Sequence, residues 1–303
     1  MISNEERERI ESIFNGKEDV VSSYVPMYPY SCERELKRIM VAYTNSLISE
    51  VKKKFPDMAR VYRTQRDIDK GIIREDGLMD LRGNLLDSLV SISDEIEKKG
   101  KLSQMDKLVV KVGRMTSKHV STEWKKGVDK TFRVDSGGDV DAALFSVLLS
   151  RFNADVKTRM ADMKNVMTNR ITTVLTDAYS AGENMTNAFR RLSRELSRLR
   201  RRAGMEARDI IGNLSSGMER ETGEHYGSGA YVWCTRRDDR VRECHRTLDG
   251  RIFRWNNPPE MWYRTRAGIV WTGRRCNPGE DYGCRCVAKP VYSLDGIRRM
   301  FGM

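Results

Sequence analysis

Residues 233–250 read Trp-Cys-Thr-Arg-Arg-Asp-Asp-Arg-Val-Arg-Glu-Cys-His-Arg-Thr-Leu-Asp-Gly, and residues 278–290 read Pro-Gly-Glu-Asp-Tyr-Gly-Cys-Arg-Cys-Val-Ala-Lys-Pro. These two blocks and Cys276 hold five of the six cysteines in the chain. Thiols and an imidazole grouped in this way, in a chain that is otherwise poor in cysteine, favour a small domain stapled by metal over scattered buried thiols.

The segment around these blocks has the pattern of a small module. Its two ends, 230–234 and 287–292, are typical of strands, and the residues between them are rich in Gly, Pro and Asn. A loop-rich interior of this kind needs a staple. On an extended backbone, Cys284 and Cys286 lie two residues apart and therefore share one face. Both sulfurs are thus expected to point to the same side.

A tetrahedral zinc site needs four ligands. The two blocks supply three of them, His245, Cys284 and Cys286. The fourth ligand stays open among the remaining cysteines, Cys276, Cys244 and Cys234. We favour Cys276, because Cys244 adjoins a ligand and neighbouring residues seldom converge on one ion. Cys234 can also be an ordinary buried thiol, and a Cys244–Cys276 disulfide is an alternative for a protein outside the cell. The predicted zinc ligands are His245, Cys284, Cys286 and Cys276.

Composition and charge restrict the partners. The 303 residues carry a net charge of +12, with a pI near 9.5 and a mean hydropathy of −0.61. Nucleic acid is the commonest partner for such a basic chain, and an acidic protein is the alternative. No apolar run approaches the roughly 20 residues of a membrane span. The charged N-terminus has no signal-peptide pattern, which predicts the cytoplasm, where thiols stay reduced.

Residues 33–225 have a helical pattern, with apolar residues spaced three and four apart. We expect helices over 33–55, 78–98 and 103–126, with breaks near Pro56, Gly77, Gly100, Gly137-Gly138 and Gly182. A single apolar stripe predicts a further long helix and is interpreted as a packing face. The stripe consists of Leu148, Phe152, Val156, Met160, Met163, Met167, Ile171, Val174 and Ala178.

The predicted fold class is α+β. A mostly α-helical N-terminal region precedes a small, loop-rich α+β module that is stapled by metal. The predicted domains are an N-terminal arm at 1–32, a helical domain at 33–225 and the Cys/His module at 226–303. The arm contains two prolines among tyrosines, which favours extended backbone. It can pack on its own chain or on a neighbour.

One further helix, expected over 185–202, carries a nearly uniform positive charge. Like charges at this spacing destabilise an isolated helix, and guanidinium groups bind phosphate oxygens well. Something acidic is therefore expected to face this helix, and DNA and an acidic protein surface are left as equal alternatives. The residues predicted to bind this partner are Arg190, Arg191, Arg194, Arg198, Arg201 and Arg202.

Enzymatic activity is the less favoured interpretation. Asp238, Asp239 and His245 would allow metal-assisted hydrolysis, but a catalytic zinc also needs an open position and a nearby base. The sequence contains no Ser-His-Asp order, phosphate-binding glycine loop or HExxH motif. We assign no catalytic residue and expect no small-molecule substrate.

The ordered combination of motifs resembles the phage head morphogenesis family, which comprises minor capsid proteins similar to phage Mu protein F and the phage SPP1 minor head protein. The similar stretches fall within 200–292. They are Ala207-Arg208, 233–238, 240–242, His245-Arg-Thr-Leu-Asp-Gly250, Pro278 and Cys284-Arg-Cys286. Many relatives carry Cys-x-x-Cys before Leu-Asp-Gly, at the positions of Arg242 and His245 here. This departure puts a four-ligand site in doubt unless Cys276 or Cys244 substitutes.

The resemblance implies a non-enzymatic minor capsid protein of a tailed bacteriophage. Such a protein is located in the virion head near the portal, and in the host cytoplasm during assembly. Its implied partners are the portal protein and capsid or scaffold proteins, with a DNA contact in some members, and its implied roles are head assembly and DNA packaging or ejection. Two alternatives stay open: a zinc-containing DNA-binding accessory protein, and a metal-dependent nuclease or toxin-like effector.

Overall fold

The computed structural model describes residues 2–70, 101–136 and 142–303. The expected helix 78–98 and the expected breaks at Gly77, Gly100 and Gly137-Gly138 lie outside these ranges. Within them, no helix combines the length and apolar character that crossing a membrane requires.

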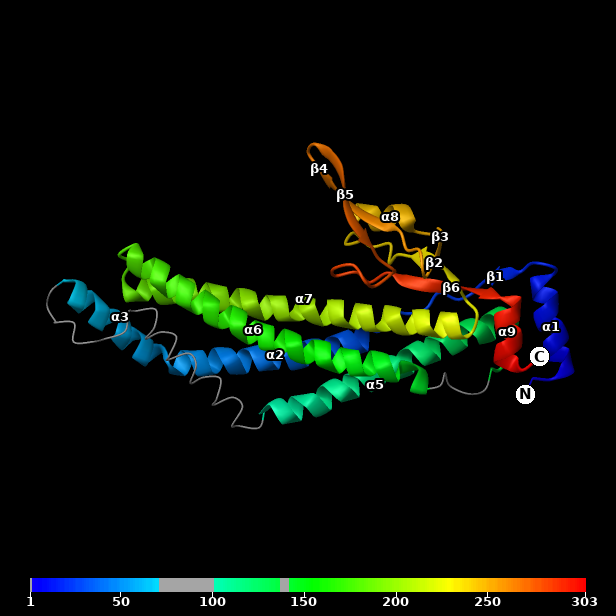
Figure 1. The fold of residues 1–303 in the computed structure, drawn as a ribbon, viewed down its shortest axis with the longest axis horizontal. Helices are drawn as coiled ribbons and strands as arrows, with labels where there is room; N and C mark the ends of the chain where they lie inside the picture. Colours follow the sequence, from blue (N-terminus) through cyan, green and yellow to red (C-terminus); the bar gives the residue numbers. More distant parts are fainter. Residues whose placement is uncertain (1, 71–100, 137–141) are drawn as a thin grey trace. The chain divides into compact units, whose positions relative to one another are not determined.

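The predicted α+β class is confirmed, with long helices first and a small sheet-containing part near the C-terminus (Figure 1). The described helices are α1 (Asn4–Phe14), α2 (Tyr30–Lys53), α3 (Phe55–Asp69), α5 (Lys101–Phe132), the 3-10 helix η1 (Ala142–Phe145), α6 (Ser146–Ser180), α7 (Met185–His225), α8 (Glu243–Leu248) and α9 (Leu294–Phe301). The described strands are β1 (Asp19–Val21), β2 (Ala230–Cys234), β3 (Ile252–Arg254), β4 (Glu260–Thr265), β5 (Gly268–Arg275) and β6 (Val287–Ser293).

Packing divides the described chain into two compact units that do not follow the order of the sequence. Unit 1 comprises Met1–Arg34, Lys111–Asn153 and Arg208–Met303, and unit 2 comprises Glu35–Val110 and Ala154–Ala207. The domains expected at 1–32, 33–225 and 226–303 stay a prediction.

Unit 2 is built from helices that bury one apolar face each. In α6, Val156, Met160 and Ile171 are buried, as the stripe predicted. In the first half of α7, Leu192 and Leu196 are buried in the same way. These residues are buried together because residues three and four apart lie on one face of a helix with 3.6 residues per turn.

Three helix boundaries differ from the expected ones. The helix expected over 103–126 runs on to Phe132 as α5. The chain leaves helix only at Lys54, and α3 starts at Phe55 with Pro56 in its first turn, where the missing N–H costs no hydrogen bond. The helix expected over 185–202 continues to His225. Gly212 lies within this helix and against another segment: a Cβ there would come within 2.4 Å of the Gly279 carbonyl oxygen.

Unit 1 contains a four-stranded sheet in the order β1-β6-β2-β3, in which all neighbours are antiparallel. The two predicted strand ends pair with each other, from Ala230 opposite Val291 to Cys234 opposite Val287. Tyr231 and Trp233 on β2 point into a core that also contains Cys284 and Cys286. The sheet therefore fixes both ends of the Cys/His module.

The strands β4 and β5 form a separate hairpin, which the sequence analysis did not predict (Figure 1). Trp262 pairs with Trp271 across it, with ring centroids 6.4 Å apart. Trp271 and Tyr263 are nevertheless largely exposed. Exposed aromatic residues of this kind are common where a protein meets a partner.

The N-terminal arm packs on its own chain, which decides between the two alternatives left by the sequence. Tyr28 is buried, and the Tyr24 hydroxyl donates to Glu123 on α5 at 2.6 Å. Strand β1 pairs with β6, and Arg298 on α9 forms an ion pair with Glu11 on α1 at 3.1 Å.

Candidate metal centre

Two segments of unit 1 bring the candidate ligands together. The short helix α8 buries Cys244, His245 and Leu248 on one face. The loop that leads into β6 carries Cys284 and Cys286, both buried. The second half of α7 supports this loop, because Gly212 allows close approach of Gly279.

The Leu-Asp-Gly motif ends α8 and ties it to β2. Asp249 accepts a hydrogen bond from the backbone N–H of Thr235 at 2.7 Å, and Gly250 donates its N–H to the Trp233 carbonyl at 2.8 Å. Gly250 has φ of 79°, a conformation that favours glycine. Leu248 packs into the core. Each residue of the motif thus positions the helix that carries His245.

Three of the four predicted ligands meet at one point. The Nδ1 atom of His245 lies 3.7 Å from the Sγ atoms of Cys284 and of Cys286. The three donor atoms all lie within 4.8 Å of one another. A tetrahedral zinc ion with ordinary bond lengths separates an N from an S ligand by about 3.6 Å and two S ligands by about 3.8 Å. The spacing therefore fits a zinc ion bound by these three side chains.

Asp281 completes the arrangement behind the imidazole. Its Oδ2 atom lies 3.1 Å from Nε2 of His245, and the residue is 7% exposed. Metal-bound histidines commonly donate their second ring nitrogen to a carboxylate, which fixes the tautomer and the ring orientation. Arg242 and Arg274 also form ion pairs with this carboxylate.

The titrating groups of the cluster are strongly coupled. Although burial opposes it, hydrogen bonds to Asp281 and Cys284 raise the pKa of His245 to about 9. The hydrogen bond from Cys286 and the imidazole hold the pKa of Cys284 well below its usual range. The pKa of Cys286 is raised, because it shares a hydrogen bond with Cys284 and is buried. Without metal, the site thus favours an imidazolium beside one thiolate.

The other cysteines have different surroundings. The Cys276 sulfur accepts a hydrogen bond from Arg274 at 3.7 Å and does not belong to the group of three donors. The Cys244 sulfur accepts from the backbone N–H of Trp262 at 3.4 Å. Cys234 ends β2 and is half-buried. The assignment of Cys276 as fourth ligand therefore stays a prediction.

Arg242 and Asp281 are the two functional positions that the sequence analysis did not connect. Arg242 donates to the Asp281 carboxylate and to the Tyr282 carbonyl. Arg242 therefore binds the carboxylate that lies against the His245 ring. No motif marks Asp281, and its place three residues before Cys284 was the one available signal.

The predicted basic surface lies on the first half of α7, in unit 2. Several arginines there have acidic partners on the same side: Arg191 pairs with Glu183, Arg198 with Glu195 and Arg202 with Glu206. In the described part of the chain, no ion pair is found for the exposed Arg194 and Arg201. A partner thus meets fewer unneutralised charges than the sequence indicated.

Comparison with known proteins identifies the segment that contains this site. Residues 169–289 match the family described as Phage Mu protein F like protein. The matched segment runs from within α6, through α7, to β6, and includes all three converging ligands and Asp281. This part of the chain is similar to the Mu F-like family, so the resemblance is confirmed over these residues.

A relative with a curated sequence covers a smaller part. A stretch of 91 residues is 35% identical to an uncharacterized protein of Haemophilus influenzae. The match spans 30% of this chain and 17% of the relative, which is therefore a much longer protein. No solved structure matches the chain.

Proposed function

We propose that this chain, with a Phage Mu protein F like segment at residues 169–289, is a minor capsid protein that acts in head morphogenesis of a tailed bacteriophage. The family match is the observation that carries this proposal, because it covers the supporting helix and the Cys/His module as one unit. Location in the virion head and roles in DNA packaging or ejection belong to the same proposal.

The proposed partners are the portal protein and capsid or scaffold proteins. Arg194 and Arg201 on the first half of α7 are exposed cations that an acidic partner, either DNA or a protein surface, would contact. The exposed aromatic residues Tyr263 and Trp271 of the hairpin offer a second contact surface.

We assign the cluster a structural role as a zinc staple and no enzymatic role. His245, Cys284 and Cys286 would hold the ion, and Asp281 would orient the imidazole. Because the bound ion links α8 to the loop before β6, the free energy of metal binding stabilises the fold of the module.

The virion proposal is tested by quantitative mass spectrometry of purified particles. We expect this chain in heads at low copy number relative to the major capsid protein. A matched particle preparation in which the gene carries an early stop codon serves as the control and should show fewer filled heads. Absence of the chain from wild-type particles would favour the non-virion accessory protein instead.

The metal is tested by elemental analysis of the native protein. We expect zinc near one equivalent, which Cys284→Ser should remove. Cys276→Ser separates the two cases for the fourth ligand: loss of zinc assigns Cys276 to the site, and retention excludes it. Stable native protein without metal would remove the staple and leave the family assignment intact.

One observation favours a second candidate function, a metal-dependent nuclease. Three protein ligands that border an open pocket are typical of catalytic zinc sites, and Asp238 on the wall of this pocket could act as a base. Plasmid incubated with the pure protein and divalent metal tests this candidate. Cleavage that is abolished in His245→Ala would establish the nuclease and overturn the structural role.

A further inference from the structure

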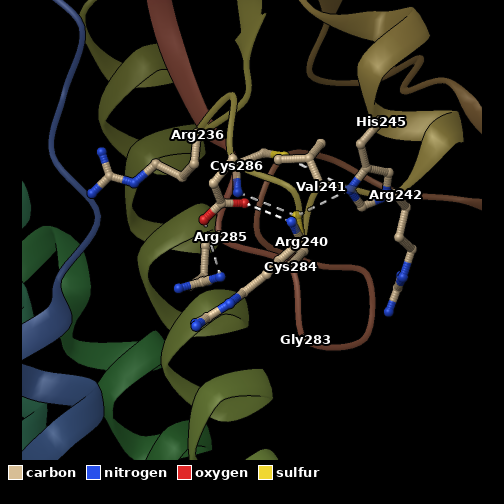
Figure 2. Close-up of a pocket in the computed structure, with 10 residues that line it drawn as sticks. Arg236, Arg240, Val241, Arg242, His245, Gly283, Cys284, Arg285 and Cys286 are labelled. Atoms are coloured by element: carbon tan, nitrogen blue, oxygen red, sulfur yellow. Dashed lines mark hydrogen bonds and ion pairs between the residues drawn. The ribbon is translucent and has the colours of Figure 1, made fainter.

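The ligand cluster forms the floor of a pocket that is lined mainly by arginines. The pocket is open to solvent, and the space within it, open solvent included, is about 340 Å³. Two segments form its wall, the loop from β2 to α8 and the loop before β6 (Figure 2). The cationic lining residues are Arg236, Arg240, Arg242 and Arg285, and the anionic one is Asp238.

Two of these arginines are already bound to the protein. Arg236 donates to the Tyr30 hydroxyl at 2.6 Å and lies over the Tyr30 ring. Arg242 is bound to Asp281. These two guanidinium groups therefore shape the wall of the pocket.

The other two, Arg240 and Arg285, are available to a ligand. Arg240 is exposed, and its side chain has no ion pair in the described ranges. Arg285 contacts Asp238 at 3.6 Å, although its side chain is only 15% exposed and that of Asp238 is 44% exposed. A guanidinium so far removed from water needs stronger compensation than one long contact with an exposed carboxylate.

The wall of the pocket carries more positive than negative charge. Four arginines line it and one carboxylate, that of Asp238. Arg242 is paired with Asp281, which lies outside the lining. A ligand in this pocket therefore meets the guanidinium groups of Arg240 and Arg285 beside the Asp238 carboxylate.

We propose that this pocket binds a phosphate group, held by Arg240 and Arg285. Guanidinium groups bind phosphate oxygens in pairs, and such charge-assisted hydrogen bonds are among the strongest in proteins. In Figure 2 both side chains extend in the same general direction from the wall. The phosphate is that of free phosphate, of a nucleic-acid terminus or of a phosphodiester backbone. The proposal rests on the pocket alone and goes beyond the head-assembly function.

The test is calorimetric titration of inorganic phosphate into the native protein at constant ionic strength. We expect saturable binding that weakens about tenfold in Arg240→Gln and in Arg285→Gln, since each removes a charge-assisted contact. The matched control is Arg237→Gln, an exposed arginine of the same loop that is bound to Asp249 and does not line the pocket. Because Arg240 is exposed, its variant leaves the core intact, and circular dichroism checks the fold of Arg285→Gln.

Oligonucleotides with and without a 5′-phosphate identify the source of the phosphate. Their affinity is compared between Arg240→Gln and Arg237→Gln, so that binding elsewhere on the protein cancels. A difference for both oligonucleotides indicates the backbone, and a difference for the 5′-phosphorylated one alone indicates the terminus. No difference for either, with phosphate still bound, indicates free phosphate. Absence of phosphate binding, equal binding in all variants, or binding of an acidic peptide in place of phosphate would overturn the proposal.

Discussion

The two halves of α7 differ in almost every physical respect, although they form one continuous helix from Met185 to His225. The first half presents exposed arginines to solvent and buries a narrow leucine stripe. The second half is buried on several sides and carries small residues, among them Gly212 and Gly217. The first half carries the exposed charge on which the proposed partner contact depends, and the second half lets a loop approach its backbone.

This difference shows that a helix can support a site without contributing a ligand to it. Gly212 and Gly279 lie against each other, and Asp209 accepts the backbone N–H of Gly283 in the ligand loop. The charge of the first half is obvious in the sequence, whereas the supporting role of the second half depends on the absence of side chains. The predictions below separate the two halves.

The largest effect is expected for Gly212→Ala. The new Cβ would lie 2.4 Å from the Gly279 carbonyl oxygen, so the loop has to move. We expect a loss of about 3 kcal/mol in the free energy of unfolding, as for overpacking in a core, together with weaker metal binding. Chemical denaturation measures it. Gly217→Ala on the same helix is the control, because its Cβ makes ordinary contact with Leu148 at 3.5 Å; equal destabilisation of both variants would contradict the close-approach argument.

Glu219, also in the second half, makes stability depend on pH. Burial raises its pKa from 4.5 to about 8, and it lines a mostly apolar pocket with Trp124 and Trp255. Between these two pKa values the folded protein binds one proton more than the unfolded chain, so stability falls as pH rises through this window.

We therefore expect Glu219→Gln to flatten this decline and to stabilise the protein at pH 7 by on the order of 3 kcal/mol. Urea denaturation at pH 5, 6, 7 and 8 measures the effect. Glu224→Gln, an exposed position on the same helix, is the control. An unchanged pH profile in Glu219→Gln would show that this carboxyl is ionised in the folded protein.

A smaller effect, on metal affinity, is expected for Asp281→Asn. Asp281 lies in the loop before β6, which packs against the second half of α7. The amide keeps an acceptor for His245 but loses the charge that neutralises Arg242 and Arg274. Metal affinity should fall about 10–100-fold, as is typical when the partner of a ligating histidine is changed. Competition with a chelating dye measures it, with the exposed Asp239→Asn as control. Equal affinities would leave Asp281 without a role in ligand orientation.

The smallest effect is expected in the first half. If DNA is the partner, the double variant Arg194→Gln/Arg201→Gln should lower the affinity of the protein for DNA several-fold. The slope of log affinity against log salt concentration should become shallower by about one to two. Fluorescence anisotropy at several salt concentrations measures both quantities. Arg202→Gln is the comparison, because Arg202 is already paired with Glu206 and should matter less. A binding constant that does not change with salt would indicate a protein partner instead.

The sequence predicted those parts of the fold and the site that depend on local periodicity or spacing. The apolar stripe on α6 and the pairing partners β2 and β6 follow from patterns of 3.6 and 2 residues. His245, Cys284 and Cys286 converge as their two blocks indicated.

Features that depend on tertiary contacts could not be predicted. The continuation of α7 through Gly212 requires knowledge of Gly279, 67 positions later in the sequence. The hydrogen bond between Asp281 and His245 could not be predicted either, because it joins two segments and no motif in either segment indicates it. Arg240 and Arg285 of the pocket come from two different loops, whereas the arginines of the first half of α7 lie close together in the sequence.

The pairing of β1 with β6 has a consequence for the order of events during synthesis. Asp19 lies opposite Ser293 in this ladder, so the sheet cannot close until residue 293 has left the ribosome. Contacts between such distant positions slow folding, because a long loop must close before they form. Strand β1 therefore stays unpaired until β6 has been synthesised. A nascent protein stalled before β6 would present an incomplete sheet to chaperones and proteases.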